Sequence, residues 1–151
     1  MRYHKGNGVR VAYDIVRTDR EHYSEGLVSA GGVADLVRQL QRIARIPNER
    51  EAMIVLALDA KHRTIALQVA SIGTVDSAPF HPREIFRLAV SVGASAVILA
   101  HNHPSGDPTP SAMDRDVTER ARLAGELLGI DVLDHVVVAE SRYFSFAESG
   151  R

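Results

Sequence analysis

The chain has 151 residues, of which 45% are hydrophobic and 25% charged, as in one ordinary globular domain. Its formal net charge of -1, from 18 basic and 19 acidic residues, gives no overall electrostatic attraction to nucleic acid or to anionic membranes. Because the sequence contains no cysteine, disulfides and thiolate metal sites are excluded, and any transition metal must be bound by imidazole and carboxylate groups.

The sequence carries no signal for membrane insertion or export. Its apolar runs are far shorter than the ~20 residues that a helix needs to span a bilayer. The first residues, Met1 to Lys5, lack the apolar stretch of a signal peptide. We therefore expect a soluble, cytoplasmic protein without a membrane partner.

Residues 1–30 are predicted to form an N-terminal extension to a domain that occupies residues 31–151. Residues 9–16 suit one strand, whereas residues 17–29 are polar and interrupted by glycine, which is typical of a loop. Hydrophobic residues at helical spacing then predict a helix that ends before Pro47. Those residues are Val33, Leu36, Val37, Leu40, Ile43 and Ala44.

The next segments predict a hairpin followed by a second helix. Residues 53–58 form a short apolar run, residues 59–63 a polar turn and residues 64–72 the partner strand. Pro82 stands where a first helical residue is expected, and Gly93 is placed to end that helix.

The last third of the sequence predicts a buried strand, a long helix and two more strands. Residues 95–100 are almost continuously apolar, which is typical of a strand covered on both faces. A loop rich in Pro and Gly leads to a helix from Ser111 to Gly129, and residues 132–139 and 143–146 read as strands. This order of elements predicts a single α/β domain with a mixed central sheet flanked by helices.

The chemical signal lies directly after the buried strand. His101 and His103 are two residues apart, so an extended backbone points both imidazoles to the same side, where they can share one ion. Asp114 falls in the first turn of the next helix, and the Pro-rich loop can fold it back towards them. Three nitrogen and oxygen ligands with one open position are typical of a catalytic zinc site, which lowers the pKa of bound water to roughly 7. The pattern therefore predicts a catalytic Zn²⁺ bound by His101, His103 and Asp114.

The spacing of these residues resembles a known metalloprotease motif. His-x-His, seven residues and Ser-x-x-Asp make up the JAMM motif of JAB/MPN domains, and His101, His103, Ser111 and Asp114 match it here. Ser-x-x-Asp before an apolar helical run also resembles a capping box, and the two interpretations are compatible because a capped helix start would fix the aspartate.

Further residues resemble the bacterial RadC-like branch of this family. They are the string His-Asn-His-Pro-Ser-Gly-Asp-Pro-x-Pro-Ser, Pro-Arg-Glu-Ile from Pro82, and Leu-Asp-His ending at His135. The resemblance covers about residues 30–148 and implies a JAMM/MPN-like fold. RadC-like proteins often carry a helix-hairpin-helix region before this domain, and we recognise no such segment in this sequence.

The resemblance also implies two residues that assist the metal. A glutamate ahead of a core strand would take a proton from the activated water; Glu51 fits best, and Glu49 is the neighbouring candidate. Ser111 resembles the family serine that donates a hydrogen bond to the developing oxyanion. We expect Asp107 to be a turn residue and His135 a hydrogen-bonding histidine at the core edge.

The implied function is a zinc-dependent hydrolase of peptide or isopeptide bonds, by analogy with the family. One alternative is a DNA-associated protein, as the repair label of RadC-like proteins suggests. The balanced charge, the aromatic content of 5% and the missing helix-hairpin-helix region argue against it. The other is a non-catalytic interaction scaffold, which the complete motif disfavours. The sequence leaves open whether the protein forms a homodimer.

Overall fold

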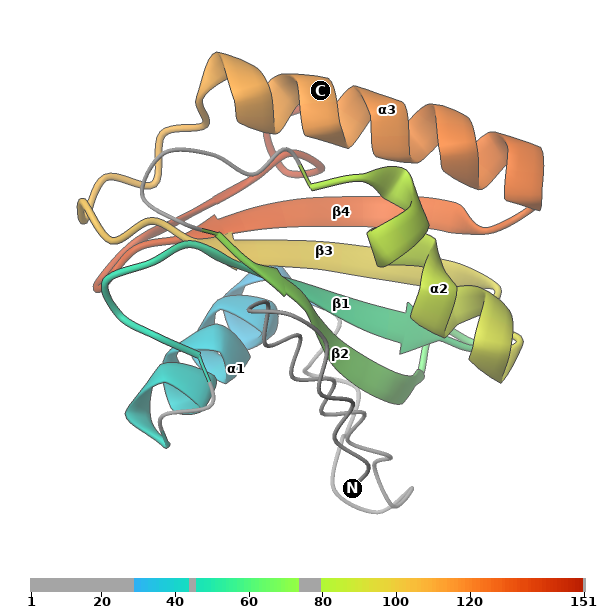
Figure 1. The fold of residues 1–151 in the computed structure, drawn as a ribbon, viewed down its shortest axis with the longest axis horizontal. Helices are drawn as coiled ribbons and strands as arrows, with labels where there is room; N and C mark the ends of the chain where they lie inside the picture. Colours follow the sequence, from blue (N-terminus) through green and yellow to red (C-terminus); the bar gives the residue numbers. More distant parts are fainter. Residues whose placement is uncertain (1–28, 44–45, 74–79, 151) are drawn as a thin grey trace, which may run out of the picture.

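The computed structural model describes residues 29–43, 46–73 and 80–150. The strand expected at residues 9–16, and all but the last residue of the loop after it, lie outside these ranges. In chain order the elements are α1 (Ala30–Arg42), β1 (Ala52–Leu58), β2 (Thr64–Ile72), α2 (Pro82–Val92), β3 (Ala96–Asn102), α3 (Ala112–Leu128), β4 (Asp131–Val138) and β5 (Tyr143–Ser145) (Figure 1).

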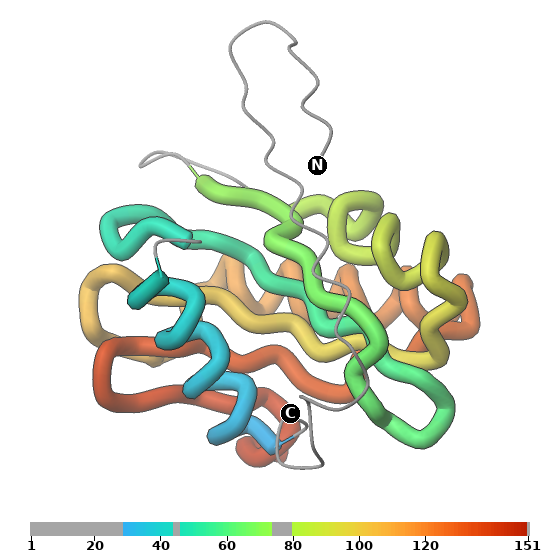
Figure 2. Tube along the Cα trace, turned by 90° about the horizontal axis from the view of Figure 1, so that it is seen from below, coloured from blue at the N-terminus to red at the C-terminus, as the bar shows by residue number. Residues whose placement is uncertain are grey.

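One mixed sheet forms the middle of the molecule. Its strand order is β2-β1-β3-β4-β5, with β3 and β4 parallel and the other three pairs antiparallel. Helix α1 covers one face, and helices α2 and α3 cover the other (Figures 1 and 2). The predicted α/β domain with a mixed sheet and flanking helices is therefore confirmed.

The two central strands explain the continuous apolar runs in the sequence. Ile54 and Leu56 of β1 belong to the core under α1, whereas Met53 and Val55 belong to the core under α2 and α3. Every residue of β1 and of β3 is buried. Because both faces are covered, these strands need apolar side chains on both sides rather than in alternation.

Strand β3 is longer than its apolar run. The run at residues 95–100 predicted its core part, yet backbone pairing continues to His101, opposite Met53 of β1, and to Asn102, opposite Val138 of β4. Hydrophobic side chains mark the portion of a strand that enters the core, and hydrogen bonding can extend beyond it. As a result His101 is held inside the sheet rather than in the following loop.

The ends predicted for the second and third helices are found, whereas the first helix ends at Arg42, before the predicted Ile43. Helix α1 begins at Ala30, after Ser29, whose side chain accepts a hydrogen bond from the Gly32 N–H. Gly93 and Gly129 end α2 and α3 in left-handed conformations, with φ of 66° and 69°. In the part of the chain that the structure describes, no helix has the length and apolarity needed to cross a membrane.

Strand β4 contains one irregularity that matters for the site. Val132 pairs with Val97 of β3, but the next pair is Asp134 with Ile98, so Leu133 is an additional residue in β4. Such a bulge reverses the alternation of side chains beyond it. His135 consequently pairs with Leu99 and lies on the α3 side of the sheet, behind His101.

Candidate metal centre

The two histidines lie at the carboxyl end of β3, on the face covered by α3. The side chain of His101 is fully buried, and that of His103, directly after the strand, is 10% exposed. The His103 N–H donates to the Val138 carbonyl at 2.8 Å, which keeps the backbone extended beyond the strand end. Their Nε2 atoms are 2.9 Å apart, so the convergence expected from a two-residue spacing is present.

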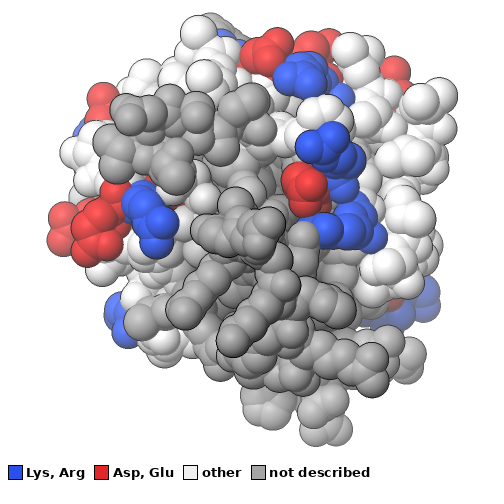
Figure 3. Space-filling view, in the orientation of Figure 1, with Lys and Arg blue, Asp and Glu red and all other residues white. Residues whose placement is uncertain are grey.

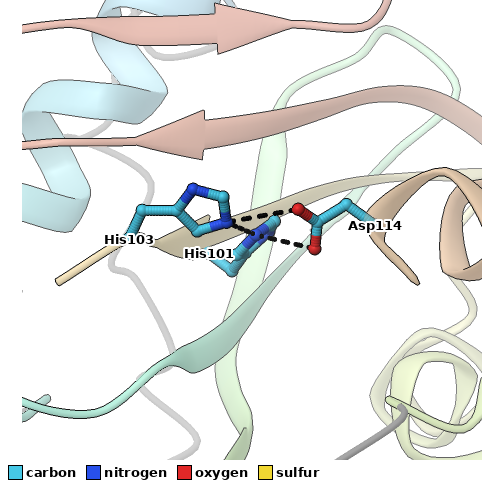
Figure 4. A group of neighbouring side chains, drawn as sticks. All are labelled: His101, His103 and Asp114. Atoms are coloured by element: carbon cyan, nitrogen blue, oxygen red, sulfur yellow. Dashed lines mark hydrogen bonds and ion pairs between the residues drawn. The ribbon is translucent and has the colours of Figure 1, made fainter. Parts of the chain in front are cut away.

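The start of α3 brings Asp114 to these histidines. Ser111 caps the helix: its Oγ accepts from the Asp114 N–H at 3.0 Å, and Asp114 Oδ2 accepts from the Ser111 N–H at 2.7 Å. The same carboxylate places Oδ1 at 3.1 Å from His101 Nε2 and Oδ2 at 3.2 Å from His103 Nε2 (Figure 4). The aspartate thus closes a capping box and faces both imidazoles, as the sequence suggested.

These three side chains fit a zinc ion. The two Nε2 atoms lie 2.9 Å apart, and each lies 3.1 or 3.2 Å from a different oxygen of the Asp114 carboxylate. A tetrahedron with zinc–ligand distances of roughly 2.0–2.1 Å has edges of about 3.3 Å. His103 Nδ1 donates to the Asp107 carbonyl at 2.8 Å, which leaves Nε2 of the neutral ring with a lone pair for a metal. His101, His103 and Asp114 could therefore hold a metal ion.

The electrostatics of the cluster favour a positive charge beside Asp114. Burial by itself would raise the pKa of Asp114, but hydrogen bonds from His101 and His103 outweigh it and hold that pKa well below its usual range. Burial would likewise lower the pKa of His103, yet its hydrogen bonds to Asp114 and to the Asp107 carbonyl raise that pKa. An ionised carboxylate facing two imidazoles is a suitable environment for a cation.

Glu51 lies at the edge of this cluster. It directly precedes β1, whose Met53 pairs with His101, and its Oε1 is 3.8 Å from His103 Nε2. Its side chain is 48% exposed, so it can reach both solvent and the ligands. Glu49 is an exposed residue of the preceding bend. The sequence left the choice between these glutamates open, and the contact with His103 favours Glu51.

Asn102, between the two histidines, fixes the backbone around Glu51. Its side chain is buried, with Oδ1 accepting from the Ala52 N–H at 2.8 Å and Nδ2 donating to the Arg50 carbonyl at 3.0 Å. These are the residues on either side of Glu51. The amide of Asn102 therefore binds protein backbone.

Comparison with known sequences agrees with the motif. The family described as "RadC-like JAB domain" matches residues 29–151. This chain belongs to that family. A UPF0758 protein of Thermotoga maritima is 51% identical over 102 residues, which are 68% of this chain and 46% of the relative. A UPF0758 protein of Trichlorobacter lovleyi is 48% identical over 103 residues, or 68% of this chain and 45% of that protein. The chain spans less than half the length of these relatives, and their names state no activity.

Two residues of this RadC-like domain lie closer to the candidate ligands than the sequence indicated. His135 was expected to form hydrogen bonds at the core edge; it is only 1% exposed, and its Nε2 lies 2.8 Å from His101 Nδ1, directly behind the candidate ligand. Thr118 was not singled out at all. Its Oγ1 is 2.6 Å from His135 Nδ1 and donates to the Asp114 carbonyl at 2.6 Å. Its position four residues after Asp114, one helical turn on, was the only available signal.

Proposed function

We propose that this RadC-like domain is a zinc-dependent hydrolase that cleaves a peptide or isopeptide bond. The observation that carries the proposal is the convergence of His101, His103 and Asp114 with the Glu51 carboxylate beside them. Two imidazoles and one carboxylate leave a fourth position open, as in catalytic zinc sites. The type of bond cleaved is taken from the resemblance to JAMM metalloproteases.

Each residue would have a separate task. Zinc in this site would act as a Lewis acid that polarises the scissile carbonyl and lowers the pKa of a bound water to roughly 7. Glu51 would accept a proton from the attacking water and pass it to the leaving amine. Ser111 accepts a hydrogen bond from the Asp114 N–H, so its own hydroxyl hydrogen remains free to donate to the developing oxyanion.

A peptide or protein is the substrate class that this proposal implies. Among the described side chains on the face shown in Figure 3, acidic and basic groups are interspersed. Nucleic-acid binding proteins usually gather Lys and Arg on one face. That face therefore offers no reason to prefer a nucleic-acid partner.

The metal site is tested by elemental analysis of the purified protein. The wild type should contain one equivalent of zinc, and His103→Ala and Asp114→Asn should lose it. Asn retains an oxygen that can accept from the Ser111 N–H, so Asp114→Asn removes the charge while keeping the helix cap. Full zinc content in either variant would overturn the ligand assignment.

The base is tested by a matched pair of glutamate variants. Glu51→Gln should keep its zinc but lose at least about 100-fold in the rate of hydrolysis of fluorogenic peptide and lysine-isopeptide panels, because general-base catalysis is typically worth that much. Glu49→Gln, two residues away, should keep both zinc and activity. The reverse result would assign the role of general base to Glu49. If the zinc-loaded wild type hydrolyses none of these substrates, the proposed reaction is wrong.

A further inference from the structure

A series of hydrogen bonds connects the back of His101 to helix α3. His101 Nδ1 contacts His135 Nε2 at 2.8 Å, His135 Nδ1 contacts Thr118 Oγ1 at 2.6 Å, and Thr118 Oγ1 contacts the Asp114 carbonyl at 2.6 Å. We call His101, His135, Thr118 and this carbonyl the support network. All three side chains are buried, and the network begins and ends at candidate ligands, His101 and Asp114.

The positions of the hydrogens in this network follow from its acceptors. The Asp114 carbonyl has no hydrogen, so the single hydroxyl hydrogen of Thr118 must lie between the two oxygens. Thr118 Oγ1 can then only accept from His135, which requires a hydrogen on His135 Nδ1. Without it, two lone pairs would face each other at 2.6 Å.

The remaining ring nitrogen of His135 must accept. The ring stacks on Phe146, with centroids 5.3 Å apart, and its two nitrogens contact the Thr118 hydroxyl and the His101 ring rather than a carboxylate. Burying an imidazolium there, with no anion to pair with it, would carry a large desolvation cost. A neutral ring with hydrogen on Nδ1 offers a lone pair at Nε2, so His101 Nδ1 must donate to it.

We propose that His135 and Thr118 are positioning residues that keep a hydrogen on His101 Nδ1 and thereby reserve His101 Nε2 for the metal. His101 Nε2 is the nitrogen that faces His103 and Asp114. The opposite tautomer would direct an N–H into the metal position. This inference rests on the proposed zinc site, and it assigns to a neutral histidine the task that a carboxylate, a carbonyl or water performs behind most metal-binding histidines.

The first test reads the tautomers directly in the metal-free protein. Long-range ¹H–¹⁵N correlation spectra distinguish protonated from unprotonated ring nitrogens. We expect His135 to be neutral with hydrogen on Nδ1, and His101 to carry hydrogen on Nδ1. A hydrogen on His135 Nε2 would overturn the inference. Because this measurement needs neither zinc nor substrate, it decides the inference even if the proposed hydrolase activity fails.

The second test measures zinc affinity in a matched pair of variants by competition with a chromophoric chelator. Thr118→Val keeps the side-chain shape but removes the hydroxyl that fixes His135, so zinc binding should weaken by about 10- to 100-fold. Thr118→Ser keeps the hydroxyl and should bind like the wild type. Dispersed amide spectra check that both variants are folded. Wild-type affinity in Thr118→Val would overturn the inference, whereas no zinc binding by the wild type would overturn the proposed function.

Discussion

Asn102 shows how a single buried amide can hold a functional residue in place. Its hydrogen bonds to the Ala52 N–H and the Arg50 carbonyl close the backbone on both sides of Glu51. The carboxylate of Glu51 itself is half exposed, and its Oε1 lies 3.8 Å from His103 Nε2, too far for a hydrogen bond. Its position is therefore determined by the backbone beneath it, and this backbone is fixed by a residue at the end of β3.

Replacing Asn102 with alanine should lower the free energy of unfolding by about 1–3 kcal/mol, because buried backbone groups would lose their partners. Urea denaturation measures this loss. Hydrolysis should fall as well, while zinc content stays at one equivalent, because the three ligands do not contact the amide. Asn48→Ala, at an exposed position, is the control and should change stability by less than about 0.5 kcal/mol. Unchanged stability in Asn102→Ala would contradict this role.

Helix α3 is the element on which the site depends most. It supplies Asp114 from its first turn and Thr118 from the next, so its position relative to β3 and β4 sets the geometry of the ligands. Gly125 permits a close approach near the other end of the helix. A Cβ at this position would lie 2.4 Å from the Ile130 carbonyl and 3.3 Å from the Phe86 ring.

Gly125→Ala should therefore destabilise the domain although alanine favours helices by roughly 1 kcal/mol. The contact is with backbone, which cannot move aside as a flexible side chain can, and overpacking of this kind typically costs about 1–3 kcal/mol. The free energy of unfolding should fall in urea titrations, with Glu126→Ala in the same helix as the exposed control. A more stable Gly125→Ala variant would show that the close approach is not required.

The candidate site is a property of the whole molecule, because β3 and α3 form it together and β1 and β4 support it. Its parts come together only on folding, so zinc should bind the native state in preference to the unfolded chain. Binding then adds to stability. The size of this effect should depend on pH, since His103 must be unprotonated to bind a metal and its pKa lies above the ordinary 6.5.

Zinc at about 100 times its dissociation constant should stabilise the protein by about 2.7 kcal/mol, or roughly 5–10 °C in Tm at this chain length. The raised pKa of His103 means that protons compete with zinc more strongly as the pH falls. At one fixed zinc concentration, the increase in Tm should therefore be larger at about pH 8 than at about pH 6. Differential scanning calorimetry with and without zinc measures both, and His103→Ala should show no increase at either pH. Equal increases at both pH values would contradict this competition.

The sequence by itself determined the features that depend on neighbouring residues. The two-residue spacing of His101 and His103 puts both on one side of any extended strand, and Ser111 with Asp114 forms a capping box in any helix that starts there. Apolar periodicity and the glycines after α2 and α3 likewise predicted the helices and strands in the part of the chain that the structure describes. These relations are local, so the tertiary structure was not needed to find them.

Only the tertiary structure decided which distant residues support the ligands. Glu51 is favoured over Glu49, and Asn102 is assigned to the backbone, because β1 pairs with β3 in one particular register. His135 is 34 residues from His101 in the sequence and reaches it because the extra residue Leu133 in β4 reverses the alternation of that strand. Strand order, register and bulges depend on packing of the whole sheet, and no local spacing in the sequence records them.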